Sequence, residues 1–130
     1  SRLPENTRRV LNEAINRIDE LKPNTIPQPE KIRWLSVLDG QIKSKIIDTH
    51  EGGENIKFNG YDNNSLETEL LVPFPYDELY VHYLESKIDY ANGEMTRYNI
   101  SATNYNASYS DFETWYHKTH KTKSVKFKYW

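Results

Sequence analysis

The sequence contains no cysteine, which excludes a disulfide framework, a thiolate metal site and a cysteine nucleophile. No apolar run approaches the roughly 20 residues of a transmembrane helix, and the first residues lack the apolar core of a signal peptide. Glycine-rich phosphate loops and nucleophile-elbow motifs are also missing. The net charge of −2 argues against a globally basic nucleic-acid-binding protein. A length of 130 residues predicts one domain, which is large enough to bury a hydrophobic core without disulfide cross-links.

Apolar content is low while aromatic content is high. Hydrophobic residues make up 36% of the chain, whereas aromatic residues reach 13% and include 10 tyrosines. Tyrosine combines a large apolar ring with a polar hydroxyl, which suits surfaces that become buried when proteins associate. This composition predicts a protein with extensive contacts to partners.

The first half of the sequence predicts two helices. Between residues 6 and 22, apolar residues recur at the spacings expected for one face of a helix. Pro23 ends this segment because it disfavours the α conformation of the residue before it. A similar pattern predicts a second helix over residues 29–49, in which Gly40, a costly residue inside a helix, is interpreted as a close approach between helices.

Residues 50–75 have a different character, being polar and rich in glycine and asparagine. Structureless loops of this length are uncommon unless they are functional. The alternation Ile56-Lys57-Phe58 is typical of a strand, so a short hairpin here is an alternative to a long polar loop.

The strongest periodicity lies in the second half of the chain. A heptad row, typical of packed helices, is formed by Leu84, Ile88, Ala91, Met95, Tyr98, Ala102, Tyr105, Tyr109, Phe112 and Tyr116. The helix-ending dipeptide Asn92-Gly93 favours two helices, over residues 76–92 and 94–118, that pack as an antiparallel hairpin through this row. One continuous helix is the alternative in a large assembly. Five aromatic residues are expected to pack the hairpin or to contact neighbouring subunits: Tyr98, Tyr105, Tyr109, Phe112 and Tyr116.

The predicted fold class is therefore all-α, a small bundle of about four helices.

Clusters of chemically reactive side chains are few. Glu113, His117 and His120 could share a helical face and bind zinc, but without the HExxH pattern solvated histidines at a helix end are favoured. Residues 62–65 resemble part of a calcium loop that lacks its glycine and terminal acid. No catalytic residue, metal site or cofactor is predicted, and the protein is not expected to be an enzyme.

The C-terminal residues form a basic and aromatic arm. Five lysines and no acid occur after His117, while the rest of the chain has twelve basic and nineteen acidic residues. Near the end, apolar and charged residues alternate as on the two faces of a strand. We expect residues 121–130 to leave a helical domain of residues 1–120 and dock on a partner, because exposed aromatic residues are costly; a frayed terminus is the alternative. The docking residues are Lys121, Lys123, Val125, Lys126, Phe127, Lys128, Tyr129 and Trp130.

An ordered set of short motifs covers most of residues 15–120. The motifs lie at residues 73–94 (PFPYDELYVHYLESKIDYANGE), 99–109 and 115–120, and nearer the front at residues 18–24, 30–35 and Asp39-Gly40. Together they resemble the head–tail connector, or adaptor, proteins of tailed phages and prophages. The resemblance implies a small helical protein, not an enzyme, that forms a homo-oligomeric ring, typically twelve-fold, below the portal of the phage head.

The same resemblance implies a virion protein at the head–tail junction that is present in the host cytoplasm during assembly. Its expected partners are further copies of itself, the portal protein, a neck, stopper or tail-completion protein, and genomic DNA that passes through the channel without sequence-specific binding. The arm resembles the portal-docking arms of this family in position, so the portal or a neighbouring subunit is its expected partner. No membrane partner is expected.

A second class of function stays open. The chain could be a small helical regulatory or nucleic-acid-binding protein that uses the basic C-terminal tail. The acidic remainder of the chain argues against a large DNA footprint, because affinity for DNA grows with the number of phosphates neutralised.

Overall fold

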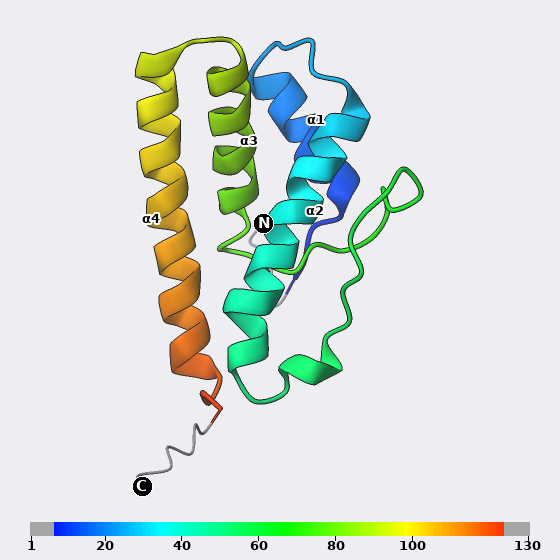
Figure 1. The fold of residues 1–130 in the computed structure, drawn as a ribbon, viewed down its shortest axis with the longest axis vertical. Helices are drawn as coiled ribbons and strands as arrows, with labels where there is room; N and C mark the ends of the chain where they lie inside the picture. Colours follow the sequence, from blue (N-terminus) through cyan, green and yellow to red (C-terminus); the bar gives the residue numbers. More distant parts are fainter. Residues whose placement is uncertain (1–6, 124–130) are drawn as a thin grey trace, which may run out of the picture.

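The computed structural model describes residues 7–123, which fold into a bundle of four α-helices (Figure 1). The helices are α1 (Leu11–Leu21), α2 (Gln28–Lys45), α3 (Glu78–Ala91) and α4 (Met95–Thr119), and two short 3₁₀ helices, η1 (Ile47–Thr49) and η2 (Gly53–Asn55), follow α2. The predicted all-α class is therefore confirmed. Within the residues described, none of the helices has the length and apolar character required to span a lipid bilayer.

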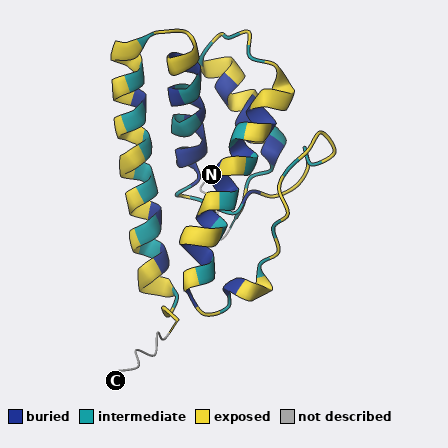
Figure 2. Ribbon diagram, viewed as in Figure 1, coloured by how far each residue is buried: buried dark blue, intermediate teal, exposed yellow. Residues whose placement is uncertain are grey.

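The hydrophobic core lies between α1, α2 and α3, and α4 packs along the outer side of α3 (Figure 1, Figure 2). Each of the first three helices buries one apolar stripe, with members Leu11, Ile15, Ile18, Leu35, Leu38, Ile42, Leu79, Leu84 and Ile88. Burying an aliphatic side chain of this size stabilises a fold by roughly 1.5–3 kcal/mol. From its last turns α4 adds Phe112 and Tyr116 to the core, whereas most of its length contacts α3.

The first helix begins at Leu11, not at residue 6 as the periodicity predicts. The residues before it are extended, and their backbone pairs with the long loop: the Leu70 N–H donates to the Arg9 carbonyl at 2.8 Å, and the Phe74 N–H to the Thr7 carbonyl at 2.7 Å. The first two N–H groups of α1 donate to loop carbonyls at residues 68 and 66. Helix starts leave such donors without helical partners, so a distant segment of chain fixes this boundary.

The second helix ends at Lys45, before the predicted boundary at residue 49. The Thr49 hydroxyl donates to the Ile46 carbonyl at 2.7 Å, and side-chain hydroxyls bonded to nearby backbone compete with α-helical hydrogen bonds. The interpretation of Gly40 is wrong. A Cβ atom at this position would lie 3.7 Å from the ring of Phe58, so Gly40 faces the loop and not another helix.

A tight turn at Asn92-Gly93 separates α3 from α4, as predicted, and the two helices run antiparallel (Figure 1). Gly93 has a φ of 71°, a left-handed conformation that glycine adopts at little cost. The heptad row is not buried throughout. Ala91 and Met95 are exposed, because they flank the turn and lie beyond the part of the hairpin that covers the core.

A buried carboxylate ties three helices together near this turn. Asp89 on α3 accepts a hydrogen bond from the Ser101 hydroxyl on α4 at 2.9 Å and pairs with the Lys22 ammonium at the end of α1. Its side chain is 2% exposed. A buried charge needs such partners, since an unpaired one would be strongly destabilising.

Residues 56–77 cross the bundle as a long loop, and the alternative of a short hairpin is wrong. The Phe58 ring packs edge-on against Tyr61 with centroids 5.0 Å apart, and the Tyr61 N–H donates to the Ser36 hydroxyl of α2 at 3.0 Å. The segment therefore takes its partners from a helix and not from an adjacent strand. Among the residues described, β-type pairing is restricted to two isolated bridges, Val10 with Glu69 and His50 with Thr122.

Candidate assembly surface

The five aromatic residues predicted for packing line the side of α4 that faces α3. Phe112 and Tyr116 are buried, whereas Tyr98, Tyr105 and Tyr109 are half-buried. The ring centroids of Tyr83 and Tyr105 are 5.2 Å apart, and those of Tyr90 and Tyr98 are 5.4 Å apart. Burial raises the pKa of the Tyr105 hydroxyl above its ordinary value. These residues pack the hairpin within one chain, and their contact with neighbouring subunits stays a prediction.

The opposite side of α4 is exposed and uncharged. From Tyr98 to Ser110 the helix contains no Lys, Arg, Asp or Glu. Seven positions in this stretch are exposed, and together they are termed here the α4 outer face: Asn99, Ile100, Thr103, Asn104, Asn106, Ala107 and Ser110. Ile100 is 61% exposed. A helix that faces only water usually carries charge on that side, so this face has the character of a contact surface. The lack of charge is a signal that the sequence reasoning missed.

A buried carboxylate in α2 holds the long loop against the bundle. Asp39 is fully buried, and its Oδ1 accepts from the Tyr80 hydroxyl at 2.7 Å while its Oδ2 accepts from the Tyr61 hydroxyl and the Leu71 N–H. Burial raises the pKa of Asp39 to about 6, although these hydrogen bonds act in the opposite direction. The Tyr80 hydroxyl also accepts from the Val72 N–H at 2.9 Å. Periodicity did not reveal this network, because it joins residues far apart in the chain.

A histidine pair lies at the end of α4, beside the first residues of the C-terminal arm. The Nδ1 of buried His50 lies 2.6 Å from the Ile46 carbonyl, which can only accept, so Nδ1 carries a proton. In the neutral ring the other nitrogen, Nε2, is an acceptor, and it lies 2.9 Å from the Nδ1 of His117. His117 therefore donates to His50. The prediction of solvated helix-end histidines does not extend to His50, which the fold buries completely.

The first residues of the arm are held beside this histidine pair. The Glu51 N–H donates to the Lys121 carbonyl at 2.7 Å, and the Lys123 N–H donates to the Thr49 carbonyl at 3.0 Å. The Lys123 ammonium lies 3.6 Å from the Glu54 carboxylate. The arm thus stays on the bundle through residue 123. Six of the predicted docking residues lie outside the described residues: Val125, Lys126, Phe127, Lys128, Tyr129 and Trp130.

We expect His50→Ala to loosen the start of the arm. The substitution removes the hydrogen-bond partner of His117 and leaves a cavity beside the backbone hydrogen bonds of Glu51 and Lys123. Amide hydrogen exchange at Glu51 and Lys123 should accelerate by about tenfold or more, since local opening becomes easier. The matched control is His82→Ala, which alters a half-buried histidine on α3. Unchanged exchange at Glu51 and Lys123 in the His50 variant would contradict this role.

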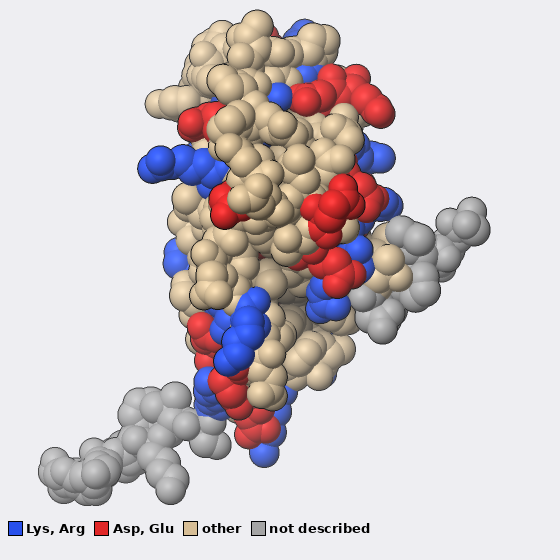
Figure 3. Space-filling view, turned by 90° about the vertical axis from the view of Figure 1, so that its right-hand side faces the viewer, with Lys and Arg blue, Asp and Glu red and all other residues tan. Residues whose placement is uncertain are grey.

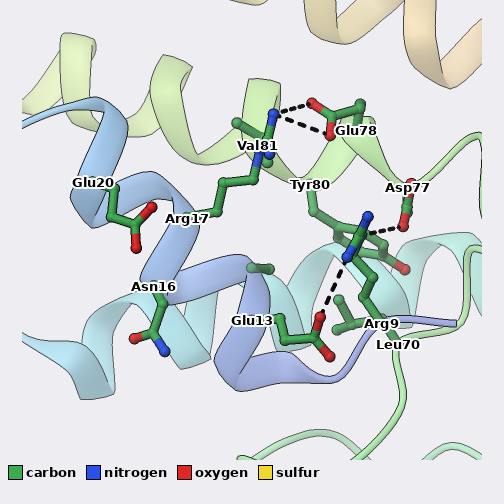
Figure 4. Close-up of a pocket in the computed structure, with 11 residues that line it drawn as sticks. Arg9, Glu13, Asn16, Arg17, Glu20, Leu70, Asp77, Glu78, Tyr80 and Val81 are labelled. Carbon is green, nitrogen blue, oxygen red and sulfur yellow. Dashed lines mark hydrogen bonds and ion pairs between the residues drawn. The ribbon is translucent and has the colours of Figure 1, made fainter. Parts of the chain in front are cut away.

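A pocket of about 270 Å³ opens between α1 and the start of α3 (Figure 4). Four acids and two arginines surround an apolar lining: Glu13, Glu20, Asp77, Glu78, Arg9 and Arg17, with Ala14, Leu70 and Val81. Arg9 lies 3.0 Å from Asp77 and 3.3 Å from Glu13, and Arg17 lies 3.5 Å from Glu78. Burial raises the pKa of Asp77, which Arg9 partly offsets. We term this site the acidic pocket, because its acids outnumber its arginines.

The candidate metal ligands of the sequence have other partners. The ring of His120 stacks on Tyr116 with centroids 3.8 Å apart, while His117 bonds to His50. The Asp62 carboxylate accepts from the Asn64 N–H at 2.8 Å inside a turn. Within residues 7–123, no group of three or more His, Asp or Glu side chains is placed to hold a metal ion.

Comparisons with protein-family models, with curated proteins and with solved structures found no match to this chain. Its function is therefore inferred from the features described above, chiefly from the α4 outer face.

Proposed function

We propose that this protein is a structural head–tail adaptor of a tailed phage or phage-like particle. Copies of the chain would form a ring below the portal that joins the DNA-filled head to the neck or tail. The observation that carries this proposal is the α4 outer face, which is exposed, uncharged and without a partner helix among residues 7–123. The resemblance of the short motifs at residues 15–120 to head–tail connector proteins supports the same proposal.

The α4 outer face suits contact between protein surfaces. Charged residues are depleted from the centres of protein interfaces, and this face has none over residues 98–110. Because α4 packs mainly on α3, the other described helices leave its outer side uncovered (Figure 1). In a ring, one surface of each copy meets a different surface of the next, and such contacts close when the rotation allows it. We therefore assign this face to the contact between neighbouring copies.

The alternative function, nucleic-acid binding by the basic tail, has less support. On the face shown in Figure 3, basic and acidic side chains are interspersed and form no broad basic surface. Of the two arm lysines that the structure describes, Lys123 already lies 3.6 Å from the Glu54 carboxylate of the bundle. DNA that only passes through a ring needs no strongly basic contact surface, because the duplex must slide without sticking.

The α4 outer face is tested by adding charge to it. In the variant Ile100→Glu/Ala107→Glu, ring assembly on isolated portal particles should fall by about tenfold or more, because buried unpaired charge opposes association. The free energy of unfolding should change by less than about 1 kcal/mol per site, because both positions are exposed, although Ile100 borders the groove that holds Glu85 and Asp89. Assembly is measured by light scattering and electron microscopy, and stability by chemical denaturation.

Gln41→Glu is the matched control, because Gln41 is an exposed residue of α2, away from the α4 outer face. It should assemble like the wild type. Unimpaired assembly of the double variant would show that the α4 outer face is not the ring contact. Failure of the wild-type protein to bind portals at all would overturn the adaptor function.

A further inference from the structure

The acidic pocket joins an apolar lining to a surplus of negative charge. Its arginines are already engaged by acids of the same pocket, as the dashed lines in Figure 4 show. Glu20 lies on the exposed side of α1 and takes no part in these ion pairs. Counting one charge for each side chain, four acids and two arginines leave the pocket at −2. The pocket thus favours an apolar group flanked by cations.

The end of this chain has that composition. Residues 124–130 read SVKFKYW, in which Lys126 and Lys128 alternate with Val125, Phe127 and Tyr129. Aromatic side chains inserted into pockets dominate the energy of many interfaces, and flanking lysines would pair with an acidic rim. The segment and the pocket therefore complement each other in both charge and apolar character.

We propose that the C-terminal residues 124–130 of one copy dock in the acidic pocket of a neighbouring copy. An aromatic side chain of the arm occupies the apolar lining, and Lys126 and Lys128 pair with acids of the rim, Glu20 among them. This docking rests on the proposed ring, which brings copies side by side. It names the receiving site on the chain itself, whereas the proposed function requires only that the α4 outer face joins the copies.

Charge favours the acidic pocket over two other grooves of the molecule. The groove beside the first residues of the arm has a mostly apolar lining that includes Arg8 and His120 and no carboxylate. The groove between α3 and α4 is lined by tyrosines and by Lys87. Neither groove offers the carboxylates that a lysine-rich segment requires.

A neighbouring copy is the favoured donor of the arm. Backbone hydrogen bonds fix Lys121 and Lys123 beside η1, at the end of the bundle where α4 finishes. The acidic pocket lies elsewhere, between α1 and the start of α3 (Figure 1, Figure 4). Residues 124–130 can span at most about 25 Å when fully extended. Because the proposed ring sets another copy beside the bundle, we assign the arm that occupies this pocket to that copy.

The chain has no native cysteine, so single cysteines allow a direct test. Full-length Asn16→Cys, with a cysteine at the acidic pocket, is mixed with full-length Lys126→Cys of a different mass. A short bismaleimide is then added, both to the free proteins at high concentration and to rings on portals. We expect an adduct that joins the two species. Gln41→Cys, on the exposed side of α2, is the control for the pocket position and should give little adduct.

Charge reversal tests the specificity of the site. Adding Glu20→Lys to the pocket copy should lower the adduct yield by about fivefold or more, and adding Lys128→Glu to the arm copy should restore at least half of it. The docking would be overturned by an adduct yield no higher than that of the Gln41→Cys control. It would also be overturned if neither charge reversal changed the yield. An adduct that forms in the double variant Asn16→Cys/Lys126→Cys, but not between the two single variants, would assign the pocket to the chain's own arm. That result would also overturn docking between copies.

The outcomes for the docking and for the adaptor function are separable. Rings that form on portals without the adduct would overturn the docking alone. An adduct between free copies that never bind portals would retain the docking and overturn the adaptor function.

Discussion

Asp39→Ala should destabilise the folded protein by about 2–4 kcal/mol at neutral pH. The substitution leaves the Tyr80 hydroxyl and the Leu71 N–H without their acceptor, and a buried donor without a partner costs about 1–3 kcal/mol. Part of this loss is offset, because the variant no longer buries a carboxylate whose pKa is raised by desolvation. The change is measured by chemical denaturation. Asp62→Ala, at an exposed turn, is the control and should alter stability by less than about 1 kcal/mol.

The effect of Asp39→Ala should also depend on pH in a defined direction. The folded-state pKa of about 6 lies above the ordinary value of 3.8, so the folded protein binds this proton more tightly than the unfolded chain. Protonation of Asp39 therefore adds stability below pH 4, and this contribution is lost as the pH rises through 6. The destabilisation caused by Asp39→Ala should be larger at pH 4.5 than at pH 7.5, by about 2 kcal/mol. A difference of the opposite sign would show that the carboxylate is stabilised in its ionised form.

Phe112→Ala should cost about 3–5 kcal/mol, the range for removing a large buried aromatic side chain. Phe112 is fully buried, and its ring lies 5.7 Å from that of Tyr116 and 6.4 Å from that of Tyr76, centroid to centroid. Its loss would leave a cavity where α4 joins the core, so α4 should separate from α3 more readily. Thermal and chemical unfolding measure the change.

Tyr105→Ala provides the comparison for Phe112. The sequence predicts equal costs for these two residues if both are buried, but Tyr105 is half-buried and keeps contact with solvent. Its truncation should cost less than that of Phe112, by about 1 kcal/mol or more. Equal losses for both variants would mean that the hairpin is packed equally well along its length, contrary to the burial seen here.

The stability of the hairpin and the function of its outer side are distinct properties. The rings of the heptad row pack against α3 and the core, whereas the positions of the α4 outer face are exposed. A substitution such as Phe112→Ala would lower stability and assembly together, while Ile100→Glu/Ala107→Glu should affect assembly alone. This separation allows adaptor function to be examined in a folded protein.

Local sequence features determined the four helices and the turn between the last two. Apolar spacing follows the period of a helix wherever one face is buried, and Asn92-Gly93 supplies the left-handed residue that ends α3. These signals lie within a few residues of one another, so they can be read along the chain without knowing what packs where. The basic and aromatic composition of the arm is equally local.

Tertiary structure alone decided the features that join distant segments. The start of α1 depends on the carbonyls of residues 66 and 68, which accept from its first N–H groups, and Asp39 meets its tyrosines only because the loop crosses α2. The burial of His50 and the acidic pocket arise in the same way, from side chains that the fold brings together. Which side of α4 faces outward was also decided here: periodicity marks the apolar side of a helix, but only the packing of α4 against α3 leaves its uncharged side open to a partner.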